Sequence, residues 1–207
     1  MNPDSGIQRR LPELISEEYA YLIGLYRYFH SHPELSGQEK TTSGRLATEL
    51  ESAGFSVSRG IGGYGIIGIL KNGDGPVVMA RADMDALPLR EETGLSYAST
   101  VRMKDPSGKE VDVMHACGHD IHMTVLAGTA RVLTRMKKEW SGTLMFIGQP
   151  SEETVSGAEK MMHEGIYTRF GRPDFGLSLH VGPEQPAGTV GYREGIFSAG
   201  SESLDIT

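Results

Sequence analysis

The sequence predicts an α/β fold, with a mixed, mostly parallel sheet flanked by helices. Helical segments with one apolar face alternate along the chain with short apolar runs, as is typical of strands buried on both faces of a parallel sheet. The 207 residues are 38% hydrophobic, which is enough to bury the core of one domain.

The first two predicted elements are helices. Apolar residues keep a 3.6-residue period over residues 14–31 and stop before Pro33, since the residue preceding a proline is disfavoured in the helical region. A second helix is predicted over residues 38–53, and Gly54 stands where a left-handed residue commonly ends a helix.

The apolar period then shortens to that of strands. Runs at residues 55–57, 66–70 and 77–80 predict three strands. Asn-Gly and Asp-Gly steps within residues 71–75 predict a hairpin between the last two of them. Residues 91–112 are polar and without pattern, so we expect a surface loop there.

Helices and strands alternate in the next part of the chain. Helices are predicted at residues 123–138 and 158–164, and strands at residues 144–147 and 175–181. The first of these helices has an expected buried stripe of six residues, Val125, Leu126, Thr129, Val132, Leu133 and Met136.

Residues 189–193 and 202–207 have the alternation of two further strands, and the second stops in mid-pattern. We therefore interpret the chain as truncated.

Composition excludes several classes of protein. One cysteine rules out an internal disulfide framework, and 27 acidic against 20 basic residues argue against a nucleic-acid-binding surface. No apolar run approaches the ~20 residues of a membrane-spanning helix, and the N-terminus lacks the features of a secretory signal. We expect a cytoplasmic protein with neither a nucleic-acid nor a membrane partner.

Residues suited to metal binding or acid–base chemistry gather in four places, three of them directly after predicted strands. They are Asp83 with Asp85, Cys117 with His119, Glu152 with Glu153, and His180. In an α/β sheet the carboxyl ends of strands and the loops that follow them form the ligand site. The sequence therefore predicts one shared site.

The cysteine and histidine flank Gly118, which lets both side chains face one point. Thiolate and imidazole suit Zn²⁺ and its neighbours in the first-row series. The alternative is that Cys117 is a small buried thiol and the histidines around it are structural.

The other candidates have structural alternatives too. Glu152 and Glu153 suit a helix N-terminus, yet one could hold a metal while the other takes a proton from water. The alternative for His180 is a buried structural histidine whose hydrogen bonds are satisfied. Asp83 and Asp85 are site residues or, alternatively, helix caps or salt-bridge partners.

A glycine-rich segment at residues 60–65 fits the G-x-G-x-x-G pattern of dinucleotide sites. That pattern must open a helix, and here it opens the predicted strand at residues 66–70. We reject a dinucleotide site.

Five short motifs follow one another along the chain. They are HSHPEL at 30–35, RADMDALP at 81–88, MHACGHD at 114–120, QPSEE at 149–153 and LHV at 179–181. In this order they resemble the M20 family of metallopeptidases, and the resemblance runs from about residue 15 to the end of the chain. More narrowly, they are similar to its amidohydrolase branch of hippurate hydrolases, N-acyl-amino-acid hydrolases and indole-acetyl-amino-acid hydrolases.

The resemblance implies a zinc-exopeptidase-like catalytic domain with two divalent ions, Zn²⁺, Mn²⁺ or Co²⁺. It implies metal ligands at Cys117, His119, Glu153 and His180.

The resemblance also implies roles beyond the ligands. It makes Glu152 the general base and Asp85 the residue that lies beneath the metal site and orients a ligand. Asp83 stands where other branches place a ligand histidine. The family gives His115 and His122 no ligand role, so we expect them to be structural.

The resemblance further implies hydrolysis of N-acyl amino acids by a homodimer that has an inserted lid and dimerisation domain. On that pattern, residues 1–196 are the N-terminal part of the catalytic domain and residues 197–207 begin the insertion. A last histidine ligand of the family has no counterpart among these 207 residues.

Three alternatives remain open. The first is a dipeptidase or carbamoylase of the same superfamily. The second is an inactive metal-binding fragment, and the third is an enzyme with Cys117 as its nucleophile.

Overall fold

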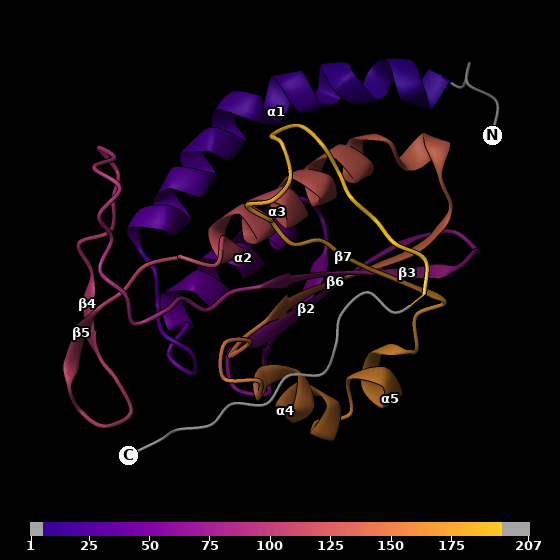
Figure 1. Cartoon of the computed structure of the whole chain (residues 1–207). Helices are drawn as coiled ribbons and strands as arrows, with labels where there is room; N and C mark the ends of the chain where they lie inside the picture. The colour runs from indigo at the N-terminus through magenta and orange to yellow at the C-terminus, as the bar shows by residue number, and fades with distance from the viewer. Residues whose placement is uncertain (1–5, 196–207) are drawn as a thin grey trace.

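A five-stranded sheet organises residues 6–195, the part of the chain that the computed structural model describes (Figure 1). Its strand order is β1-β2-β6-β3-β7. The strands are β1 (Ser56–Ile61), β2 (Gly65–Asn72), β6 (Gly142–Gln149), β3 (Val77–Asp83) and β7 (Phe175–Ser178). β6, β3 and β7 pair in parallel, whereas β2 pairs antiparallel with both β1 and β6. Four strands therefore run in one direction, and the predicted mixed, mostly parallel sheet is confirmed.

The predicted hairpin between β2 and β3 is wrong. β6 lies between them, with Asn72 opposite Gly142 on one side and Val77 opposite Thr143 on the other. The turn signals at residues 71–75 are local, and they carry no information about a strand that comes much later in the chain.

Helices cover both faces of the sheet (Figure 1). The main core joins one face to α1 (Gly6–Ser31), α2 (Lys40–Ser52) and α3 (His119–Arg135), and includes Leu25, Leu46, Leu126 and Phe146. A second cluster joins the other face to α4 (Gly157–His163) and α5 (Ile166–Phe170). Side chains of successive β2 residues point to opposite faces of the sheet, so Ile66 belongs to the main core and Ile67 to the second cluster.

The helix α3 begins four residues before its predicted start, and this places His119 in its first turn. Gly118 precedes it with a left-handed φ of 78°. Three of the predicted stripe residues, Leu126, Val132 and Met136, are buried. Val125 is 38% exposed, so its predicted burial is wrong. A short 3₁₀ turn, η1 (Lys137–Glu139), follows the helix.

The expected surface loop contains a small hairpin of β4 (Arg102–Lys104) and β5 (Glu110–Asp112). Its turn is held by Asp105, whose carboxylate accepts hydrogen bonds from the Ser107 and Lys109 backbone amides at 2.9 and 3.0 Å. Strands of three residues are too short to show an alternating pattern.

The predicted strand at residues 189–193 is wrong. These residues form no strand, and Val190 and Tyr192 are 93% and 88% exposed. Their alternation therefore reflects no buried face. The predicted strand at 202–207 and the domain boundary after residue 196 lie outside the described residues. Within residues 6–195, none of the helices is long and apolar enough to cross a membrane.

Candidate metal centre

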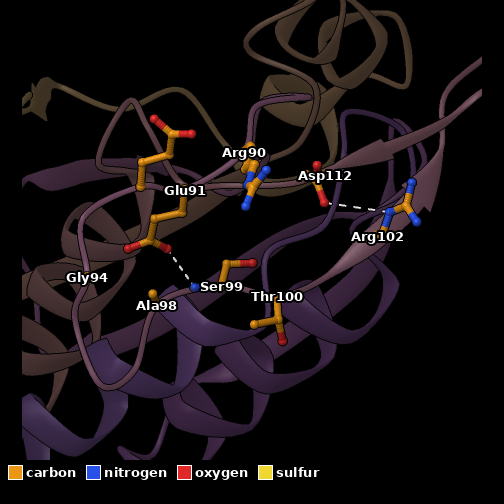
Figure 2. Close-up of a pocket in the computed structure, with 9 residues that line it drawn as sticks. Arg90, Glu91, Gly94, Ala98, Ser99, Thr100, Arg102 and Asp112 are labelled. Atoms are coloured by element: carbon orange, nitrogen blue, oxygen red, sulfur yellow. Dashed lines mark hydrogen bonds and ion pairs between the residues drawn. The ribbon is translucent and has the colours of Figure 1, made fainter.

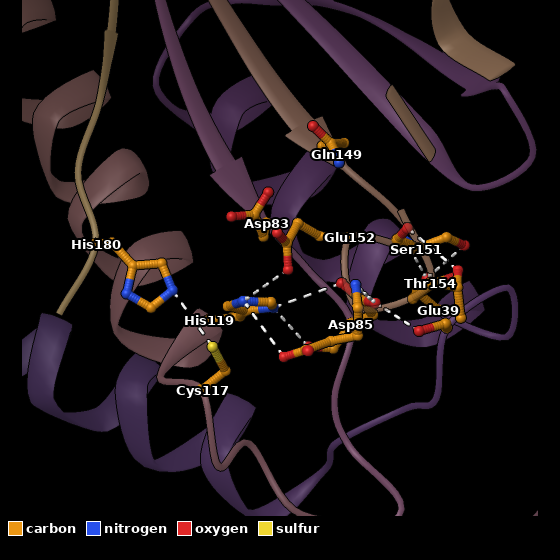
Figure 3. A network of polar contacts seen from close by, with 12 residues as sticks. Glu39, Asp83, Asp85, Cys117, His119, Gln149, Ser151, Glu152, Thr154 and His180 are labelled. Carbon is orange, nitrogen blue, oxygen red and sulfur yellow. Dashed lines mark hydrogen bonds and ion pairs between the residues drawn. The ribbon is translucent and has the colours of Figure 1, made fainter. Parts of the chain in front are cut away.

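The polar residues predicted to share a site lie together at one edge of the sheet (Figure 3). Asp83 ends β3 and is paired in register with Gln149, which ends β6. Ser178 ends the neighbouring parallel strand β7, two residues before His180. Because these three strands run in parallel, the loops that follow them meet, and the first turn of α3 adds His119.

His119 is at the centre of the cluster and is fully buried. Its Nδ1 lies 2.8 Å from the backbone oxygen of Asp85, and since a carbonyl only accepts, Nδ1 donates its proton there. Nε2 is then the free lone pair. It has no hydrogen-bond partner among the described residues and lies 3.7 Å from Glu152 and 3.8 Å from Glu153. This is the arrangement of a metal-ligating imidazole.

Cys117 and His180 form a second side of the cluster. The Cys117 Sγ and His180 Nε2 atoms are 3.3 Å apart, and His180 Nδ1 lies 2.7 Å from the Val181 backbone oxygen. Burial and the negative charge of Glu153 raise the pKa of the Cys117 thiol to about 12. Without a cation the sulfur is therefore a thiol at neutral pH.

Asp85 lies beneath the cluster and is buried. Its carboxylate accepts hydrogen bonds from Ser36 Oγ at 2.6 Å and from the Glu153 backbone amide at 3.0 Å. Burial acts to raise its pKa, but the neighbouring His119 ring and the hydrogen bonds from Ser36 and Glu153 outweigh burial and lower it. The ionised Asp85 thus contacts two predicted ligands at once.

The turn after β6 carries the two glutamates, and a buried carboxylate fixes this turn from behind. Glu39 Oε1 accepts the Ser151 backbone amide at 2.7 Å and the Gly37 amide at 2.9 Å. The Glu152 side chain is 39% exposed, whereas that of Glu153 is 18% exposed. Glu153 therefore faces inward and Glu152 faces the open side.

Sequence reasoning missed Ser36 and Glu39 as supports of the site. Ser36 directly follows the HSHPEL motif, which was the one available signal for it. Nothing in the local sequence marks Glu39, because its partner Ser151 is distant in the sequence.

Asp83 and His122 lie at the back of the cluster. An Asp83 oxygen is 2.8 Å from the Arg81 guanidinium, in line with the predicted alternative of a salt-bridge partner. Burial lowers the pKa of His122 to about 3, and its Nε2 accepts the Val181 backbone amide at 3.1 Å. His115 is buried as well, and neither ring nitrogen finds a hydrogen-bond partner within residues 6–195.

A buried ion cluster connects α3 to the loop at residues 89–101. His30 Nδ1 lies 2.7 Å from Asp120, the residue after His119, and His30 Nε2 lies 3.0 Å from Glu91. Glu91 also lines a hollow of about 690 Å³ beside the β4–β5 hairpin (Figure 2). None of the residues that line this hollow belongs to the cluster around His119, so the hollow is separate from the predicted site.

The donor set fits divalent cations. Among residues 6–195, three groups have ligand atoms within 4.8 Å of one another, and all three include His119. The groups are Cys117 with His119 and His180, His119 with Glu152 and Glu153, and Asp83 with His119 and His122. Sulfur, imidazole and carboxylate donors around one point suit Zn²⁺ and related first-row metals. The structure brings all six predicted site residues together, and their individual roles stay predictions.

Comparison with known proteins identifies the family. Residues 79–205 match the family model described as peptidase family M20/M25/M40. An IAA-amino acid hydrolase of Arabidopsis thaliana is 37% identical over all of this chain and 45% of its own length. An N-acetylcysteine deacetylase of Bacillus subtilis is 38% identical over 89% of this chain and 46% of its own length.

Solved structures agree with the sequence relatives. A dinuclear metal-binding peptidase of the M20 family from Bacillus subtilis matches with a TM-score of 0.76 and 37% identity, over 87% of this chain and 48% of that one. The chain spans about half the length of the curated relatives it matches. The family match covers more than half of the chain itself, and the chain belongs to peptidase family M20/M25/M40.

Proposed function

We propose that this chain carries the reactive residues of a metal-dependent hydrolase that cleaves the amide bond of N-acyl amino acids, releasing a carboxylic acid and an amino acid. The observation that carries the proposal is the buried, partnerless Nε2 of His119, which faces two glutamates and belongs to the same donor cluster as Cys117 and His180. Two relatives, named as an IAA-amino acid hydrolase and an N-acetylcysteine deacetylase, support this substrate class.

Four residues would hold the cations, namely Cys117, His119, Glu153 and His180. We propose two divalent ions of the Zn²⁺, Mn²⁺ or Co²⁺ class, and the relative described as dinuclear supports the number. Such ions polarise a substrate carbonyl and lower the pKa of water.

Glu152 is the proposed general base. Its carboxylate lies beside His119 but is more exposed than that of Glu153, so it faces the open side of the cluster, where substrate and water would arrive. It would accept a proton from the water that attacks the carbonyl carbon and return that proton to the leaving amine nitrogen. Asp85 would hold His119 and the Glu153 backbone in place through the contacts described above.

The experiment compares Glu152→Gln with Glu159→Gln, a matched change at an exposed glutamate of α4. Metal affinity and release of amino acid from N-acetyl amino acids are measured for both variants in the complete enzyme. We expect Glu152→Gln to keep the metal and lose about 10²- to 10⁴-fold in turnover, and Glu159→Gln to change neither. Unchanged turnover in Glu152→Gln would contradict the proposed base.

Metal binding without turnover is the second candidate for this chain by itself. It is favoured by one observation, that the chain spans about half the length of its relatives. Metal uptake by the purified chain without hydrolysis of any N-acyl amino acid would support it. Hydrolysis of dipeptides or N-carbamoyl amino acids instead would support the dipeptidase or carbamoylase alternative.

A cysteine nucleophile is disfavoured by the environment of Cys117. A nucleophilic cysteine needs a lowered pKa, whereas burial and Glu153 raise the pKa of this thiol.

The cytoplasmic location and the homodimer stay predictions. Cell fractionation would check the location, and light scattering would check the oligomeric state.

A further inference from the structure

The segment that carries His180 lies past the end of the sheet. β7 pairs with β3, and their last paired residues are Ser178 and Arg81. His180 comes two residues later, and the whole of β7 is exposed. The β-ladder therefore does not determine where the imidazole of His180 points.

Two contacts from the start of α3 hold this segment. The Val181 backbone amide donates to His122 Nε2 at 3.1 Å, and the rings of His122 and His180 lie 4.5 Å apart at 68°. On the other side Val181 packs against Gly118, where a Cβ atom would overlap its Cγ2 methyl. Val181 is thus fixed between the residue before His119 and the residue three after it.

The contacts continue from Val181 to the sulfur of Cys117. The Val181 backbone oxygen accepts from His180 Nδ1 at 2.7 Å, which leaves the Nε2 lone pair of His180 facing Cys117 at 3.3 Å. One peptide plane away, the amide of Val181 is held by His122. A shift of this amide would therefore move His180 relative to Cys117.

We propose that His122 is a positioning residue that, by accepting the Val181 amide, places His180 against Cys117 and so sets the affinity of the cation that this pair holds. The inference rests on the metal site of the proposed function and assigns no ligand role to His122. Residues that orient metal ligands typically contribute 10- to 100-fold in metal affinity.

The test uses three variants of the 207-residue chain. His122→Leu keeps a similar volume but removes the acceptor, and His122→Gln restores an acceptor oxygen near the position of Nε2. His115→Leu is the matched control, because His115 is equally buried and has no hydrogen-bond partner in the described structure. Each chain is titrated with Co²⁺, and the thiolate-to-cobalt absorption band reports on Cys117.

We expect His122→Leu to weaken Co²⁺ binding about 10-fold or more, His122→Gln to restore most of it, and His115→Leu to leave it within about threefold. Equal binding by His122→Leu and the unsubstituted chain would overturn the proposal. Equal losses in His122→Leu and His115→Leu would overturn it too, because the effect would then be general destabilisation.

A metal-free measurement separates this proposal from the proposed function. Amide hydrogen exchange at Val181 should speed up in His122→Leu and remain slow in His122→Gln, with no cation present. Unchanged exchange contradicts the positioning contact. If Val181 exchanged as expected in both His122 variants but the unsubstituted chain showed no cobalt–thiolate band, the metal site would be contradicted instead.

Discussion

Gly157 tests whether the turn that carries the two glutamates must keep its present shape. It is the first residue of α4, and its amide bonds the Ser151 backbone oxygen at 3.2 Å. A Cβ atom at this position would lie 2.6 Å from the carbonyl carbon of Pro150 and closer still to its oxygen. Ordinary contacts begin at 3.4 Å, so the carbonyl carbon of Pro150 alone would have to move by roughly 0.8 Å in Gly157→Ala, and its oxygen, which is closer, by more.

The magnitude of the effect follows from what that backbone holds. No side-chain rotation can relieve a clash between a Cβ and a carbonyl, and Glu153, three residues after Pro150, is fixed by a 3.0 Å bond from its amide to Asp85. Overpacking of this kind costs about 1–3 kcal/mol in stability. Because ligands are displaced together with their supports, we expect metal affinity to fall about 10- to 100-fold.

Calorimetric titration with Zn²⁺ and urea unfolding measure the two effects separately. Gly24→Ala is the matched control, since Gly24 is exposed in the middle of α1 and a Cβ added there would meet no atom within 4 Å. Alanine there should raise the free energy of unfolding by about 0.5–1 kcal/mol and leave metal affinity unchanged. If Gly157→Ala bound Zn²⁺ as tightly as the unsubstituted chain, the assignment of Glu153 as a ligand would be refuted.

Two further predictions concern stability. Burial acts to lower the pKa of His30, but hydrogen bonds to Glu91 and Asp120 outweigh burial and raise this pKa above its ordinary 6.5. The protonated ring therefore stabilises the fold below pH 6.5, and this contribution is lost as the pH rises through the raised pKa. In urea unfolding, His30→Gln should therefore lower the free energy of unfolding most near pH 6 and less towards pH 9. A loss that stays constant with pH would contradict the prediction. Leu46→Ala, at a fully buried position, should cost about 2–5 kcal/mol in the same assay, whereas Leu89→Ala, at a half-exposed position, should cost far less.

The sequence could predict that these polar residues lie close together, because their proximity depends mainly on the direction of the strands that they follow. Residues that follow parallel strands meet at one edge of the sheet, so Asp83 and Glu152 could be brought together without any knowledge of strand order. Strand order could not be predicted from local turns, and the hairpin expected at residues 71–75 was therefore wrong. The order depends on β6, which pairs with β2 and β3 although it is distant from both in the sequence.

The start of α3 illustrates a different limit. Periodicity detects a helix by its apolar face, and the first turn of α3 carries His119, Asp120 and His122 instead of apolar residues. The helix was therefore predicted to begin at residue 123, after the turn that matters for the chemistry. This polar first turn hides the start of the helix from an analysis of periodicity, and it also places His119 in the cluster.

The buried polar atoms of the centre connect the stability of the fold to its chemistry. His119 Nε2, Asp85 Oδ1 and Glu153 Oε1 are buried, and none has a hydrogen-bond partner in the described part of the chain. Each such atom costs about 1–3 kcal/mol, against a total stability of about 5–15 kcal/mol for a typical domain. A fold that tolerates three of them at one point must be stabilised elsewhere, and the main core supplies that stability through fully buried residues such as Leu46, Leu50 and Ile66. Cations bound by His119 Nε2 and Glu153 Oε1 would remove the cost of those two atoms, so metal binding should stabilise the folded chain.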